Sequence, residues 1–161
     1  MNPKVTLEIC KTLCEKIGYD PYYVYAVIET ESNRRTDVVS DAGAIGMMQL
    51  KEIAVLDVNQ RYNTLFTKED LFNPLFNIEI GILFLKRWEE VFRKMKFDEG
   101  AVKFFTLLTY AWGYGNVMNW LKVKPCNIEI KRNIPQDKLT YVYNVMYWYN
   151  HSKNVGYVEA P

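Results

Sequence analysis

Three pairs of an Asx residue followed by proline constrain the fold of this chain more than any other feature. They lie at residues 2–3, 20–21 and 73–74, and each directly precedes a segment whose apolar residues recur at helical spacing. Asparagine and aspartate cap helices, and proline suits the first turn because that position donates no intrahelical hydrogen bond. The pairs therefore predict helices over residues 3–17 and 21–32, and a third that begins at Pro74.

The remaining segments also favour helices. We expect a loop over residues 33–46, a short helix from about Met47 to Asp57, a helix over residues 99–112 and a final helix from about Asp137 to Asn150. The helix after Pro74 is apolar on so many sides that it is expected to be central and buried. No segment has a convincing strand pattern. With 161 residues, 49% of them hydrophobic, the sequence predicts a single all-α domain over residues 1–161.

Charge, cysteine content and hydropathy argue against several classes of protein. The 20 Lys and Arg nearly balance the 19 Asp and Glu, so we expect no nucleic-acid partner. No apolar run is long enough for a membrane span, and the N-terminus has no signal-peptide pattern. Cys10, Cys14 and Cys126 are predicted to be reduced thiols, and His151 is the only histidine. We therefore expect no metal and no other cofactor.

Glu31 is the residue that most suggests chemistry. On the helix predicted over residues 21–32, an apolar stripe continues onto Glu31, whereas Glu29 points nearly the opposite way. A carboxyl group on an apolar stripe is poorly hydrated, which raises its pKa and lets it act as a general acid. The alternative is a buried carboxylate paired with a cation, which Arg34 or Arg35 could supply. Position on the helix does not separate these two interpretations.

Four segments in sequence order resemble motifs of the lytic transglycosylases related to the soluble lytic transglycosylase (SLT) catalytic domain. Glu31-Ser32 with SDAGAIGMMQL from Ser40 is similar to that family's Glu-Ser and Ser-x-x-Gly-Ala-x-Gly-Leu-Met-Gln patterns. NPLFNIEIG at residues 73–81 resembles Asn-Pro-x-x-Asn-Ile-x-x-Gly, and TYAWGYGNV at residues 109–117 stands where the family has Ala-Tyr-Asn-Ala-Gly-Pro-Gly-x-Val. The last match is a Tyr-Val-x-x-Val pattern that begins at Tyr141.

This resemblance implies a lysozyme-like fold, with helices around a central buried helix and a groove for saccharides. It implies an enzyme that breaks the β-1,4 bond between N-acetylmuramic acid and N-acetylglucosamine in peptidoglycan. Glu31 would act first as acid and then as base, and the product would carry a 1,6-anhydromuramoyl end. Asp37 and Asp41 are the nearest candidates for a second catalytic carboxylate, and both are expected to be solvated residues of the polar loop.

The resemblance also implies roles for four substrate-binding residues. Ser40 would contact the sugar near the bond to be broken, although its hydroxyl could equally cap the following turn. Gln49 would line the groove. Tyr110 would lie beside the catalytic glutamate, and Tyr141 would supply a second such contact, although either tyrosine could belong to the core.

Other motif residues are expected to have structural roles. Met48, Asn77 and Gly81 are assigned to packing and capping, and Gly43 and Gly46 to turns of the backbone. The segment TYAWGYG departs from the family pattern, because aromatic residues replace an alanine and a proline. Its aromatic rings and a nearby tryptophan could stack on sugars or pack in the core. These residues are Trp112, Tyr114 and Trp120.

Three functions are therefore considered. The first is a lytic transglycosylase. The second is a hydrolytic enzyme resembling goose-type lysozymes, and the third is an inactive glycan-binding or structural module. We expect a monomer that acts on periplasmic or extracellular peptidoglycan strands. The missing signal pattern fits a phage endolysin made in the host cytosol, a lysin of the phage particle, or an excised domain of an exported enzyme.

Overall fold

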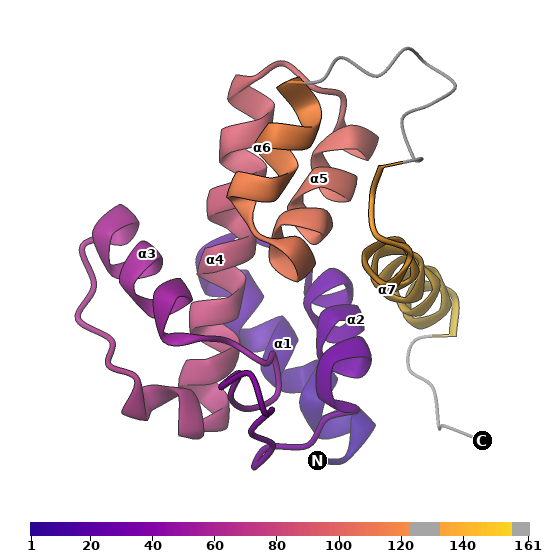
Figure 1. The fold of residues 1–161 in the computed structure, drawn as a ribbon. Coiled ribbons are helices and arrows are strands. Elements are labelled where there is room, and N and C mark those ends of the chain that lie inside the picture. The colour runs from indigo at the N-terminus through magenta and orange to yellow at the C-terminus, as the bar shows by residue number, and fades with distance from the viewer. Residues whose placement is uncertain (123–132, 156–161) are drawn as a thin grey trace. The chain divides into compact units, whose positions relative to one another are not determined.

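The computed structural model describes residues 1–122 and 133–155, and this part of the chain is built from helices (Figure 1). The helices are α1 (Pro3–Ile17), α2 (Pro21–Ser32), α3 (Glu52–Tyr62), the short 3-10 helix η1 (Glu69–Phe72), α4 (Pro74–Lys94), α5 (Glu99–Trp112), α6 (Tyr114–Lys122) and α7 (Gln136–Val155). The predicted all-α class is confirmed. No helix among these residues is long and apolar enough to cross a membrane. Cys126 lies outside the described residues.

The chain divides into two compact units. The first unit comprises Met1–Arg87 and Val145–Pro161, and the second comprises Trp88–Asn144. The first unit contains α1, α2, α3 and η1, and the second contains α5 and α6; α4 and α7 each contribute residues to both.

All three Asx-Pro pairs begin helices, as predicted. The side chain of Asn2 accepts a hydrogen bond from the backbone N–H of Lys4 at 2.9 Å, and Asp20 accepts one from Tyr22 at 3.0 Å. Asn73 accepts one from the N–H of Leu75 at 2.9 Å. Each cap satisfies a backbone donor that the helix itself leaves without an acceptor.

The prediction of a helix from Met47 to Asp57 is wrong at its start. The helix in this region, α3, begins at Glu52. Ile45 forms isolated antiparallel bridges with Val39 and Leu50, and Gln49 has a positive φ of 47°. These bridges and this left-handed residue are incompatible with a continuous helix.

Helix α6 was not predicted from the sequence. Of the two glycines that follow the helix predicted over residues 99–112, only Gly113 needs glycine's conformational freedom, with φ of 88°, whereas Gly115 lies within α6. The final helix, α7, is also longer at its C-terminal end than the sequence pattern indicated.

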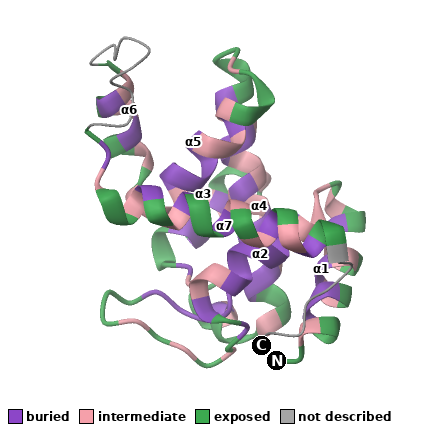
Figure 2. Ribbon diagram, turned by 90° about the vertical axis from the view of Figure 1, so that its right-hand side faces the viewer, coloured by how far each residue is buried: buried purple, intermediate pink, exposed green. Residues whose placement is uncertain are grey.

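The core of the first unit is centred on α2. Every residue from Tyr23 to Glu29 is buried, and purple marks this helix in Figure 2. Helix α1 packs against α2 and buries Cys10 and Cys14, which form no disulfide. Burial raises the pKa of both thiols, that of Cys14 to about 12, so they stay protonated at neutral pH. These two cysteines therefore have the packing role that was predicted.

The core of the second unit is aromatic. Helix α5 packs against α6, and the ring of Phe105 lies 6.0 Å from that of Trp120 and 5.5 Å from that of Phe92. Trp120 is buried, as expected for a core residue.

Candidate active site

Glu31 lies in the last turn of α2 and is half-buried. The next residue, Ser32, is fully enclosed, and its hydroxyl donates to the carbonyl of Met47 at 2.8 Å. This hydrogen bond joins the end of α2 to the loop that follows it. The serine of the Glu-Ser motif is thus in direct contact with the second motif, SDAGAIGMMQL.

The structure contains a buried ion pair at Glu29. Glu29 is only 7% exposed, and its carboxylate accepts a hydrogen bond from the guanidinium of Arg34. Glu29 is buried although it points away from the stripe that carries Glu31, because every residue of α2 from Tyr23 to Glu29 is buried. Arg35 instead donates from Nε to the backbone carbonyl of Ser32 at 3.0 Å.

The hydroxyl of Ser40 and the amide of Gln49 both take part in the loop's own hydrogen bonds. Ser40 Oγ accepts from the N–H of Ala44 at 3.0 Å, which is the turn-capping role considered above. The side-chain amide of Gln49 donates to the carbonyls of Val38 at 3.1 Å and Gly46 at 2.9 Å. Both side chains are half-buried. Their assignment as sugar contacts stays a prediction.

Asn77 of α4 forms hydrogen bonds with the backbone of the same loop. Its amide nitrogen donates to the carbonyls of Ile45 and Leu71, each at 2.9 Å, and its amide oxygen accepts from the N–H of Met48 at 2.9 Å. Asn77 is fully buried, so these bonds are shielded from water. The asparagine of the NPLFNIEIG motif therefore positions the backbone of the SDAGAIGMMQL motif.

Two glycines allow the loop and α4 to approach closely. A Cβ atom at Gly46 would lie 2.8 Å from the carbonyl oxygen of Leu71, and one at Gly81 would lie 2.6 Å from Cε of Met48. Gly46 also has a positive φ of 75°. Met48 is fully buried against Gly81, which agrees with the packing role predicted for both residues.

Tyr110 and Tyr141 belong to the second unit, where they lie side by side. Tyr110 is in the last turns of α5 and Tyr141 is on α7. Their rings are nearly parallel, with centroids 6.4 Å apart and an angle of 9° between the planes. Both side chains are half-buried. Their proposed contacts to the catalytic glutamate and to substrate stay predictions.

The altered segment TYAWGYG contributes to the packing of the second unit. Tyr114 stacks on Trp88 with ring centroids 4.4 Å apart and an interplanar angle of 27°. Together with the buried Trp120, this favours the core interpretation for two of the three aromatic residues. Trp112 is half-buried at the end of α5.

Two features of the site were missed at the level of sequence. One is the pairing of Glu29 with Arg34, which requires the chain to fold back directly after α2. The other is the use of Asn77 as a clamp on the loop, since asparagine in a helix has many roles. The pair could have been suspected from the sequence, because Glu29 and Arg34 lie on either side of the end predicted for the helix over residues 21–32.

Comparison with known proteins places this geometry in a family. The Transglycosylase SLT domain matches residues 9–132. Membrane-bound lytic murein transglycosylase C from Salmonella arizonae is 28% identical over 137 residues, which is 81% of this chain and 37% of that protein. Endo-type membrane-bound lytic murein transglycosylase A from Klebsiella pneumoniae is 32% identical over 104 residues, or 63% of this chain and 51% of that protein. The chain thus spans about a third to a half of these relatives.

Solved structures support the fold. An inactive mutant of the lytic transglycosylase Slt from Pseudomonas aeruginosa superimposes with a TM-score of 0.75 at 20% identity, and the match covers 95% of this chain and 24% of that one. The 70 kDa soluble lytic transglycosylase from Escherichia coli gives a TM-score of 0.76 at 22% identity, with 91% and 24% covered. At such identities the likeness establishes the fold alone, and the fold is the lysozyme-like one that was predicted.

Proposed function

The chain belongs to the Transglycosylase SLT domain family, and from this premise we propose that it is a peptidoglycan lytic transglycosylase with Glu31 as its catalytic acid and base. The names of its relatives supply the substrate, murein. The observation that carries the assignment to Glu31 is its position in the last turn of α2, directly before the serine that holds the motif loop.

In the proposed reaction the carboxyl of Glu31 donates its proton to the glycosidic oxygen as the bond to C1 of the muramoyl residue breaks. The C6 hydroxyl oxygen of the same sugar then bonds to C1, and its proton returns to the Glu31 carboxylate. No water is consumed, so the atoms of substrate and products balance and the enzyme is regenerated. The product carries a 1,6-anhydromuramoyl end.

The surroundings of the other nearby carboxylates support a mechanism with one acid. The carboxylate of Glu29 is engaged in the buried ion pair with Arg34, so it is not available to a substrate. Asp37 and Asp41 are both exposed in the loop, as the sequence indicated. Glycosidases that use two carboxylates hold them roughly 5–10 Å apart on either side of the bond, within the substrate site.

The test is digestion of purified sacculi followed by mass analysis of the released fragments. We expect wild-type protein to release anhydromuramoyl fragments and Glu31→Gln to lower the rate by at least about 10²-fold, because the amide cannot donate or accept the proton. Asp41→Asn, in the exposed part of the same loop, is the matched control and should stay within about twofold of wild type. Release by Glu31→Gln at the wild-type rate would exclude this role.

Two other functions would give different products in the same digest. Reducing muramoyl ends would select the hydrolytic, lysozyme-like enzyme. Binding to sacculi without release of fragments would select the glycan-binding module. The half-buried position of Glu31 favours the catalytic alternatives, because a partly desolvated carboxyl is costly to retain without a use.

The proposed place of action is the peptidoglycan outside the cytoplasmic membrane, with glycan strands as the partner and a monomer as the active form. A phage endolysin is one setting that fits this proposal. A lysin of the phage particle and a domain of an exported bacterial enzyme are the two others.

A further inference from the structure

The chain takes an unusual path directly after the proposed catalytic residue. Asn33 and Arg34 both have positive φ angles, 49° and 63°, although neither is glycine. Two consecutive left-handed residues with side chains are unfavourable unless the surrounding contacts hold them. The backbone around Glu31 is therefore shaped by specific interactions.

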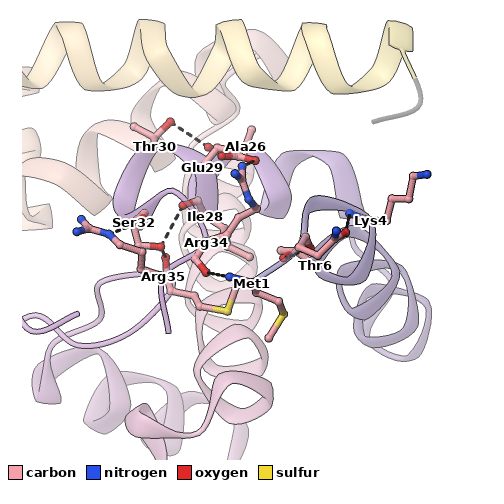
Figure 3. A network of polar contacts seen from close by, with 12 residues as sticks. Met1, Lys4, Thr6, Ala26, Ile28, Glu29, Thr30, Ser32, Arg34 and Arg35 are labelled. Atoms are coloured by element: carbon pink, nitrogen blue, oxygen red, sulfur yellow. Dashed lines mark hydrogen bonds and ion pairs between the residues drawn. The ribbon is translucent and has the colours of Figure 1, made fainter. Parts of the chain in front are cut away.

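One of these interactions is the buried ion pair between Arg34 and Glu29. The side chains of the pair are 11% and 2% exposed, and Figure 3 shows them turned toward one another across the last turn of α2. Burial, and then the Glu29 carboxylate, raise the pKa of Tyr25 one turn earlier on α2. Because a buried carboxylate is costly without its cation, Arg34 is held in its left-handed conformation.

Further hydrogen bonds fix the residues next to this pair. The N–H of Asn33 donates to the carbonyl of Glu29 at 3.1 Å, and the N–H of Arg35 donates to that of Ser32 at 3.2 Å. The backbone nitrogen of Met1 donates to the carbonyl of Arg34 at 2.8 Å (Figure 3). The backbone is thus tied down on both sides of Glu31, at residue 29 and at residues 32–35.

We propose that Arg34 is a positioning residue for Glu31, acting through its ion pair with Glu29. This inference rests on the proposed function. The pair fixes the last turn of α2 and thereby the direction in which the Glu31 carboxyl meets the glycosidic oxygen. A general acid that is displaced by a fraction of an ångström loses rate while substrate binding is largely kept.

The test separates positioning from stability by replacing both members of the pair. Glu29→Leu with Arg34→Met removes two charges and keeps similar volumes, a change that is often neutral for folding. We expect this double variant to melt near the wild-type temperature, with kcat on soluble glycan strands lowered by roughly 10- to 100-fold and KM within about twofold. A wild-type kcat in the folded double variant would overturn the proposal.

A conservative variant keeps the test decisive if the double variant does not fold. Arg34→Lys retains the charge beside Glu29 but not the planar guanidinium. We expect it to fold and to lose about three- to tenfold in kcat, and an unchanged kcat would contradict the proposal. Arg61→Met, at an exposed arginine of the same unit, is the control and should match wild type.

Amide hydrogen exchange gives a readout that does not depend on activity. In the double variant the N–H groups of Asn33 and Arg35 should exchange about tenfold faster, while those within α1 keep their wild-type rates. Unchanged exchange at both positions would overturn the positioning role. If wild-type protein releases no anhydromuramoyl product, the proposed function is excluded. The exchange result still shows whether the ion pair of Glu29 and Arg34 stabilises the last turn of α2.

Discussion

The two units of the molecule use different means to hold their motifs. In the first unit, Asn77 makes three hydrogen bonds to backbone groups, and Gly81 leaves room for Met48. In the second unit, Tyr114 packs through its ring against Trp88. Directional bonds to backbone groups accept few other residue types, whereas ring packing accepts many. The position of Asn77 should therefore tolerate fewer substitutions than that of Tyr114.

Asn77→Ala should have the largest effect on stability. It leaves the N–H of Met48 and the carbonyls of Ile45 and Leu71 buried without their present partner, and each such loss costs roughly 1–3 kcal/mol. We expect the free energy of unfolding, measured by urea denaturation, to fall by about 3–5 kcal/mol. Asn116→Ala in the second unit is the control, because this exposed side chain makes one hydrogen bond, to the carbonyl of Trp112 at 2.7 Å. If both variants lost the same free energy of unfolding, the proposed difference between the two units would be contradicted.

Gly81→Ala should have the next largest effect, with a matched glycine in the second unit. The new methyl group would meet the side chain of Met48, and overpacking of this kind costs about 1–3 kcal/mol. Gly115 also lies in a helix, but a Cβ there has nothing within 4 Å. Gly115→Ala should therefore stabilise the protein by about 0.5–1 kcal/mol through helix propensity. The same sign of change in melting temperature for both variants would contradict this account.

Ser40→Ala should have an intermediate effect and report on the loop. It removes the oxygen that accepts from the N–H of Ala44, which should cost about 1 kcal/mol in urea denaturation. If Ser40 also contacts the sugar, as the family resemblance implies, the variant should in addition raise KM on glycan strands. A change in stability with an unchanged KM would leave Ser40 with the turn-capping role alone.

Tyr114→Phe should have the smallest effect. The ring stack on Trp88 is kept and only the hydroxyl is lost, so the free energy of unfolding should change by less than about 0.5 kcal/mol. Tyr114→Leu, which removes the ring, should cost more. If the phenylalanine variant loses as much stability as the leucine variant, the hydroxyl and not the ring holds this position.

The sequence predicted those parts of the fold that depend on local chemistry. The Asx-Pro pairs located three helix starts because capping involves neighbours within one turn. The spacing of the motif from Glu31 to Gln49 identified the family, although the roles of its residues remain predictions. The start of α3 was misplaced because the bridges of Ile45 pair residues across the loop, which helical periodicity does not report.

Long-range contacts were harder to predict from the sequence. The sequence suggested that Arg34 could pair with a carboxylate at this helix end, but it did not indicate the left-handed conformations of Asn33 and Arg34 or the choice of Glu29 as the partner. Glu29 is the last of seven consecutive buried residues of α2, and a single apolar stripe does not predict such a run. Helix α6 was not predicted because Gly113 and Gly115 are poor helix formers, although only Gly113 has a positive φ.

The central claim is that one carboxyl group performs both proton transfers and that the sugar's own hydroxyl, not water, closes the reaction. The most direct measurement is digestion of sacculi in water enriched in ¹⁸O, with mass analysis of the muramoyl ends. We predict anhydromuramoyl fragments without ¹⁸O from wild-type protein, and release that is at least about 10²-fold slower from Glu31→Gln. Reducing ends that carry one ¹⁸O atom would contradict the claim.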